Sequence, residues 1–208
     1  MNNLIRLPQA ILLLGPTGSG KTPLGEALEK SGFRGRRCRH FDFGASLRSC
    51  APGLGPELTP AELQVVRESL ANGVLLTDQQ FPIAAKILNE FISSIDRDSL
   101  IILNGLPRHA GQAAALNSLV EMAGVIVLEC DAGTVMRRIV SDTGGDRGGR
   151  CDDSASSIAR KLTIYEQQTM PLIEYYRSLG VPLLLVDVGV NDGAETVRLA
   201  AEAAPEVI

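Results

Sequence analysis

The chain has 208 residues, of which 45% are hydrophobic and 21% charged, ordinary values for a globular protein that argue against disorder. Its 20 Lys and Arg against 24 Asp and Glu give a formal net charge of −4, the opposite sign to that expected of a protein that binds nucleic acid or anionic membranes over its whole surface. Sixteen of the 20 basic residues are Arg. This excess is either a compositional bias of the lineage or a set of bidentate phosphate ligands.

The N-terminal segment and the cysteines bear on where the protein works. Met1–Pro8 lacks the pattern of a signal peptide, and no apolar stretch approaches the ~18 residues of a membrane span. Cys38, Cys50, Cys130 and Cys151 form no Cys-x-x-Cys pair, so we expect no structural zinc and a reduced compartment. We predict a cytoplasmic monomer whose partners are small molecules, with no nucleic acid and no membrane among them.

Five short apolar runs alternate with longer segments of helical period along the chain. Each run has the length of a strand buried on both faces and lacks the strict alternation of a half-exposed strand. The predicted strands are Ala10–Leu14, a weaker one at Arg39–Phe43, Leu100–Leu103, Val125–Leu128 and Leu183–Val186. Ser154–Leu179 is predicted to be helical, with a bend or break at Pro171. The alternation indicates an α/β fold with a parallel sheet.

The sequence also contains signals for the starts of two helices and for two long loops. Thr59–Glu62 is a capping box with Pro at the first helical position, and Thr77–Gln80 is a second capping box. Cys50–Pro60 is rich in Pro and Gly and is predicted to be a loop. Ser141–Asp153 is polar and glycine-rich without apolar periodicity, and loops of this length inside a compact domain are usually functional or mobile.

The first predicted strand runs directly into the sequence Gly-Pro-Thr-Gly-Ser-Gly-Lys-Thr, which satisfies G-x-x-x-x-G-K-[ST] and precedes an amphipathic stretch. In this setting the glycines let backbone N–H groups turn toward phosphate, and the helix N-terminus adds positive charge. Lys21 would reach the β- and γ-phosphates and Thr22 would hold Mg²⁺ through its hydroxyl. The expected ATP-binding residues of the loop are Gly15, Gly18, Ser19, Gly20, Lys21 and Thr22.

Four further segments carry a resemblance to a known family. His40–Arg48 reads H-F-D-F-G-A-S-L-R and resembles H-I-S-T-G-D-x-L-R, while Asn104–Arg108 with Gln112 resembles D-G-F-P-R-x-x-x-Q. Gly149–Asp153 resembles G-R-x-D-D, and Tyr165–Tyr176 matches a last long helix. In this order and spacing the segments resemble a divergent adenylate kinase, a nucleoside monophosphate kinase of the short-lid type.

The resemblance implies an architecture. It is the P-loop NTPase fold, a three-layer α/β/α sandwich with a parallel five-stranded sheet, in a single domain over 1–208. A small helical monophosphate-binding insertion is expected at about 40–75 and a short lid at about 141–153.

The resemblance also implies a role for each matching residue. Arg48 and Arg108 would clamp the phosphate of the acceptor, and Gln112 would hydrogen-bond its base. Arg138 would lie over the adenine of ATP, and Arg150 would fold with the lid onto the transferring phosphoryl group. The catalytic residues would be Lys21, Arg108, Arg138 and Arg150. The acceptor pocket would include Gly44, Leu76 and Gly105, and the lid would include Arg147, Arg150, Asp152 and Asp153.

Some positions depart from the family's pattern. Asn104 stands where the strand-end motif has Asp, so it could support the Mg²⁺ held by Thr22 only weakly and without binding the ion directly. Ala45 replaces another Asp, Phe43 replaces a small Thr in the base pocket, and Asp142 falls where a lid arginine is expected. Lys161 replaces a downstream arginine.

Three functions remain open on the sequence. The first is ATP-dependent phosphoryl transfer, with Mg²⁺, to a nucleoside monophosphate, most naturally AMP, giving two ADP. The second is a nucleotide-binding protein with weakened catalysis. The third is a P-loop kinase for another small phosphate-bearing or hydroxyl acceptor.

Overall fold

The computed structural model describes residues 6–53, 55–146 and 154–207. Its centre is a parallel sheet of five strands in the order β2-β3-β1-β4-β5. The strands are β1 Gln9–Leu14, β2 Cys38–Asp42, β3 Leu100–Asn104, β4 Glu121–Glu129 and β5 Leu183–Asp187. The predicted parallel five-stranded sheet is therefore confirmed. The second strand stops one residue earlier than the sequence suggested, because the side chain of Asp42 accepts a hydrogen bond from Ala45 N and starts a helix at Phe43.

Both faces of the inner strands are buried, which is why β1, β3 and the second half of β4 are nearly continuous apolar runs, whereas the edge strand β2 exposes Arg39. In β1, Ala10, Leu12 and Leu14 point into one apolar core, whereas Ile11 and Leu13 point into the other. All five of these side chains are at most 5% exposed. Successive side chains of a strand point to opposite faces, so one short segment supplies both cores.

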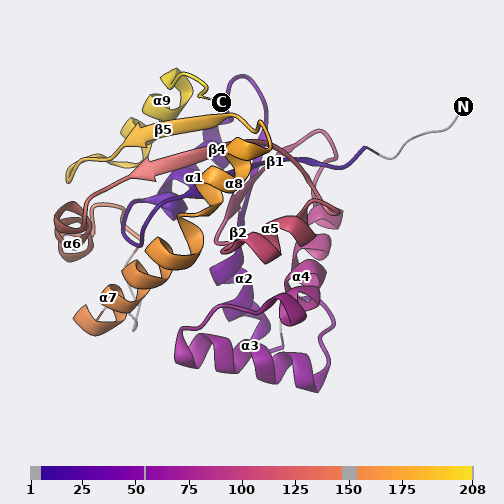
Figure 1. Cartoon of the computed structure of the whole chain (residues 1–208). Coiled ribbons are helices and arrows are strands. Elements are labelled where there is room, and N and C mark those ends of the chain that lie inside the picture. The colour runs from indigo at the N-terminus through magenta and orange to yellow at the C-terminus, as the bar shows by residue number, and fades with distance from the viewer. Residues whose placement is uncertain (1–5, 54, 147–153, 208) are drawn as a thin grey trace, which may run out of the picture.

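Helices cover the two faces and complete the three layers (Figure 1). On one face lie α1, Lys21–Ser31, and α9, Ala194–Ala203, which bury Leu24 and Val197 in one core. On the other face lie α4, Phe81–Ser94, α5, Ala110–Leu116, and α8, Leu172–Ser178. The observed architecture is thus the predicted α/β/α sandwich.

A helical segment separates β2 from β3 and projects beyond the sheet, where α3 forms the lower edge of the molecule in Figure 1. It begins with α2, Phe43–Cys50, followed by α3, Pro60–Asn72, and the 3₁₀ turn Asp78–Gln80 that leads into α4. The predicted capping box at the start of α3 is present, because Glu62 N–H donates to Thr59 Oγ1 and Thr59 N–H donates to Glu62 Oε2. Thr77 and Gln80 form the second box.

The predicted C-terminal helical segment is divided in two. α7 spans Ala155–Ile164, a π-helical turn spans Tyr165–Thr169, and α8 begins after Pro171. Proline lacks an N–H donor and its ring crowds the preceding turn, so the expected break occurs at this point. π-turns inside helices are frequent at functional sites. The remaining helix, α6, spans Ala132–Val140. Across the described part of the chain, no helix combines the length and apolar character needed to cross a bilayer.

Candidate active site

The loop between β1 and α1 has the shape of a phosphate cradle. Gly15, Gly18 and Gly20 adopt φ angles of 151°, 80° and 97°, which side chains disfavour. A Cβ at Gly15 would also lie 2.9 Å from Leu128 O, so glycine is required there for space. No side chain caps the N-terminus of α1, which leaves its first N–H groups to bind an anion.

The side chains of this loop fall into two kinds. Ser19 is fully buried and its Oγ donates to Pro16 O at 2.9 Å, so it holds the shape of the loop. Lys21 Nζ donates to the carbonyl oxygens of Gly15 and Pro16, at 2.7 Å each, which places its ammonium group over the loop. This is the position from which a lysine reaches the phosphates of a bound nucleotide.

Three polar side chains meet beside the cradle at the carboxyl ends of β2 and β3. Thr22 Oγ1 donates to Asp42 Oδ2 at 2.9 Å, and Asn104 Nδ2 donates to both of these atoms, at 2.9 and 3.0 Å. Burial raises the pKa of Asp42, but hydrogen bonds from Ala45 and Thr22 and the charges of His40 and Arg48 outweigh burial, so the pKa lies below its usual value. Asp42 is therefore an ionised carboxylate next to the cradle.

The sequence did not identify Asp42 as a site residue. It lay inside the quoted H-F-D-F-G segment without a role, although a carboxylate at the end of a predicted buried strand was a usable signal. Parallel strands place their carboxyl ends at one edge of the sheet, and Asp42 is paired in register with Asn104.

Two arginines on the acceptor side face the same cavity as the cradle. The cavity is lined by Lys21, Asp42, Arg48 and Arg108, among others. Arg108 Nε donates to Gly105 O at 3.0 Å, and Gly105 needs its φ of 85° to make the turn after β3. Burial lowers the pKa of Arg108, while the charge of Asp42 raises it. Gly44 lies beside the other arginine, Arg48, since a Cβ there would be in van der Waals contact with its Nη1 at 3.4 Å.

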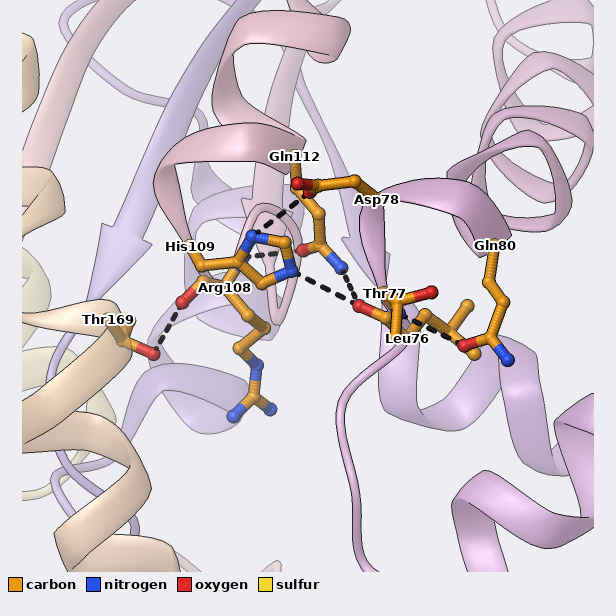
Figure 2. A network of polar contacts seen from close by, with 8 residues as sticks. All are labelled: Leu76, Thr77, Asp78, Gln80, Arg108, His109, Gln112 and Thr169. Atoms are coloured by element: carbon orange, nitrogen blue, oxygen red, sulfur yellow. Dashed lines mark hydrogen bonds and ion pairs between the residues drawn. The ribbon is translucent and has the colours of Figure 1, made fainter.

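A network of polar contacts builds the wall of the acceptor side (Figure 2). Gln112 is 1% exposed; its Oε1 accepts from Arg108 N at 2.8 Å and its Nε2 donates to Leu76 O at 2.8 Å. His109 Nε2 donates to the same carbonyl at 3.1 Å, and its Nδ1 lies 3.4 Å from Asp78 Oδ1. These contacts fix the segment after α3 against the start of α5.

In this network Gln112 has a structural role that the sequence did not indicate. Its amide joins two backbone segments that line the cavity, including Leu76. The predicted contact between Gln112 and a base stays a prediction, and would use the remaining N–H and lone pair of the amide.

The π-turn also contacts the acceptor side. Thr169 Oγ1 donates to Arg108 O at 2.9 Å, as Figure 2 shows. Tyr165, Thr169 and Lys161 all line the cavity. The helical break next to Pro171 therefore adds residues to the site, and neither Tyr165 nor Thr169 was assigned a role from the sequence.

Arg138 is buried beneath the phosphate loop. It is 3% exposed, and its guanidinium donates to the carbonyl oxygens of Gly18 at 3.1 Å, Gly189 at 2.6 Å and Asp192 at 2.8 Å. It therefore joins the cradle to the loop after β5. The predicted position of Arg138 over the adenine of ATP stays a prediction, and its visible role is to hold two loops together.

The predicted lid is described only in part. Arg147, Arg150, Asp152 and Asp153 lie outside the described residues, so their roles stay predictions. Asp142, the charge that did not fit the sequence pattern, has a φ of 45° and its carbonyl accepts from Gly145 N at 2.9 Å. Asp is among the residues that tolerate this conformation best, which explains an Asp in this turn.

Together, the sheet, the cradle and the site at the carboxyl ends of the strands define a P-loop protein of the phosphotransferase class. The adenylate kinase family model matches residues 13–181. An adenylate kinase of Synechococcus sp. (strain WH7803) is 32% identical over 207 residues, covering 95% of this chain and all of the relative. One of Parvibaculum lavamentivorans is 31% identical over 176 residues, covering 82% and 80%. The chain belongs to the adenylate kinase family.

A solved structure adds a comparison of shape. A gluconokinase from Sinorhizobium meliloti 1021 superposes with a TM-score of 0.57 at 18% identity, covering 95% of this chain and 91% of its own. At this identity the likeness concerns the fold, which is that of a P-loop kinase.

Proposed function

We propose that the protein is an ATP-dependent nucleoside monophosphate kinase that transfers the γ-phosphoryl group of ATP to AMP and forms two ADP. The observation that carries this proposal is one cavity with a phosphate cradle at Lys21 and two arginines, Arg48 and Arg108, on its acceptor side. Two separate groups of positive charge suit two separate phosphate groups, one donated and one accepting.

The chemistry asks little of the protein beyond position and charge. An oxygen of the acceptor phosphate attacks the γ-phosphorus, the bond from the γ-phosphorus to the bridging oxygen breaks, and ADP leaves. The attacking oxygen is already anionic, so no base has to remove a proton. Lys21 and the loop N–H groups would hold the donor phosphates, and Arg48 and Arg108 would orient the acceptor. The predicted lid, with Arg150, would exclude water from the cavity.

Magnesium would accompany ATP in this reaction. The hydroxyl of Thr22 lies at the start of α1 beside a carboxylate, and hydroxyl and carboxylate oxygens are ligands that Mg²⁺ accepts. The residues present therefore fit the ion, with Thr22 as its first protein contact. Bound Mg²⁺ supplies charge neutralisation for the phosphates.

The acceptor side also offers an apolar surface for a base. Phe43, Leu47, Leu70 and Val74 line the cavity next to Arg48. A flat purine buries its faces on such residues, and we infer that AMP is the natural acceptor on this ground together with the family.

The test is a coupled assay with ATP, Mg²⁺ and a panel of monophosphates, namely AMP, GMP, CMP, UMP and dTMP. We expect ADP formation with AMP as the preferred acceptor. Arg48→Met and Arg108→Met should raise the KM for the monophosphate, and Arg97→Met, at an exposed position before β3, is the matched control. Absence of diphosphate from every acceptor at high enzyme concentration would refute the proposal. Tight ATP binding without turnover would instead support the weakened nucleotide-binding protein.

A second candidate is phosphoryl transfer to a hydroxyl acceptor. It is favoured by the ionised carboxylate of Asp42 in the cavity, because a hydroxyl nucleophile must lose a proton and a carboxylate can take it. Small polyols and sugar acids, gluconate included, belong in the same panel. Product from one of these and none from any monophosphate would decide for this candidate.

A further inference from the structure

Asp42 and Asn104 lie side by side at the carboxyl ends of β2 and β3. The carboxylate is on β2 and the amide is on β3, whereas the resemblance led us to expect the carboxylate on β3. The resemblance placed a carboxylate at position 104, next to the cradle, and the chain has an amide there. The structure brings the carboxylate of Asp42 to the same point from the neighbouring strand, in register with Asn104. The negative charge has therefore moved by one strand and has not been lost.

The contacts among the three side chains define which atoms face a cation. Asn104 is 5% exposed and directs Nδ2 at both Asp42 Oδ2 and Thr22 Oγ1. An amide nitrogen faces the carboxylate because an amide oxygen there would be repelled. Asn104 thus presents a hydrogen-bond donor, which cannot bind a metal, while Thr22 and Asp42 present oxygens.

We propose that Asp42 is the carboxylate of the magnesium site and that Asn104 is a positioning residue, which holds Asp42 against Thr22. This inference rests on the proposed use of MgATP. A hydroxyl that donates its proton to a carboxylate directs its lone pairs away from it, so Thr22 Oγ1 can bind the cation while it keeps its bond to Asp42. The hydrogen bond from Ala45 N to Asp42 Oδ1 fixes the other end of the carboxylate.

The arrangement explains why a carboxylate is tolerated in a cavity for polyanions. Without a cation, Asp42 repels the phosphates that Lys21 and the arginines attract. With Mg²⁺ bound, the same carboxylate attracts the metal–nucleotide complex. Asp42 therefore makes the site selective for MgATP over free ATP.

This selectivity gives a test that does not depend on turnover. The affinity for a non-hydrolysable ATP analogue is measured by calorimetry in EDTA and in Mg²⁺, and Mn²⁺ binding to the protein–analogue complex is measured by electron paramagnetic resonance. We expect Asp42→Asn to lower Mn²⁺ affinity at least tenfold. In EDTA the variant should bind the analogue at least as tightly as the unmodified protein. A residue with a merely structural role would weaken binding in both conditions.

Two further variants sharpen the result. The exchange Asp42→Asn with Asn104→Asp returns a carboxylate to the pair and should restore Mn²⁺ affinity to within about threefold. The matched control is Asp98→Asn, which removes the same charge from an exposed position before β3, away from the cavity, and should leave Mn²⁺ affinity within about twofold. Asn at position 42 can still cap α2, so the variant should fold.

Several outcomes would overturn the proposal. They are unchanged Mn²⁺ affinity in Asp42→Asn, an equal loss of nucleotide affinity in EDTA and Mg²⁺, and an exchange variant as weak as the single one. Unchanged Mn²⁺ affinity together with lost turnover would assign Asp42 as a base. If Asp42→Asn does not fold, the single variant Asn104→Asp replaces it in the test. This variant places two carboxylates side by side, so Mn²⁺ should raise its Tm by more than it raises the Tm of the unmodified protein. If the unmodified protein binds MgATP but phosphorylates no monophosphate, the proposed function fails while this test still decides the role of Asp42.

Discussion

Gly25 in α1 packs directly against the imidazole ring of His40 in β2. Replacing Gly25 by alanine has two opposing effects on stability, a gain in helix propensity and a loss from overpacking. A Cβ at position 25 would lie 2.6 Å from His40 Cε1 and would overlap Nε2 and Cδ2 more closely. Ala in a helix interior gains about 1 kcal/mol over Gly. Overpacking a buried contact costs about 1–3 kcal/mol. His40 Nε2 is buried, so we take the upper end and expect Gly25→Ala to lower the free energy of unfolding by about 2 kcal/mol.

The measurement is urea denaturation followed by circular dichroism. With a slope near 2 kcal/mol per molar urea, the midpoint should fall by about 1 M. In a His40→Ala background the clash is gone, so the same substitution should stabilise by up to about 1 kcal/mol, and the cycle should show a coupling of about 3 kcal/mol. The matched control is Gly111→Ala in α5, where the three atoms nearest to a Cβ all belong to the carboxylate of Asp78, a side chain that is 68% exposed and can move at the expense of its contact with His109. A neutral Gly25→Ala, or an equal loss in both backgrounds, would refute the reasoning.

Four other outcomes follow from the structure. Lys21→Ala should abolish ATP-dependent turnover, whereas Arg108→Ala should mainly raise the KM for the monophosphate, by the equivalent of about 1.5–3 kcal/mol; equal defects toward both substrates in steady-state kinetics would contradict this division. Arg138→Met leaves carbonyl groups of two loops without a charged donor, so urea denaturation should show a loss of about 3 kcal/mol and calorimetry a weaker ATP affinity. Thr59→Ala removes a helix cap and should cost about 1 kcal/mol in the same denaturation assay while ATP affinity stays unchanged. Burial lowers the pKa of His40 below 6.5, against the raising effect of Asp42, Glu29 and Glu26, so the unfolded chain binds a proton first as the pH falls. Stability should therefore drop from pH 7 to 5.5, and a His40→Asn variant should lack this slope.

The fold was predictable because its signals are local. Strand β1 is a continuous apolar run followed by the glycines of the cradle, and the start of α3 is encoded by Thr59 and Glu62 within four residues. The break near Pro171 follows from one missing N–H group. None of these inferences needs to know which segments meet in space.

The site residues were predictable only where they belong to a contiguous sequence motif. Lys21 and Thr22 belong to one contiguous pattern, but the contact of Thr22 with Asp42 joins residues from two elements and depends on the order of the strands. Asn104 could be recognised as a missing carboxylate, while its replacement by Asp42 required the register of β2 and β3. The buried bonds of Arg138 depend in the same way on where the loop after β5 lies.

The bonds of Arg138 have a consequence for how the protein is made. The phosphate loop is synthesised well before two of the carbonyl groups that hold Arg138 against it, because those of Gly189 and Asp192 lie in the loop after β5. A growing chain on the ribosome therefore contains the phosphate loop before it contains the carbonyl groups that fix Arg138 against that loop. We expect a nascent chain to gain affinity for ATP only after the loop that follows β5 has been synthesised and has left the ribosome.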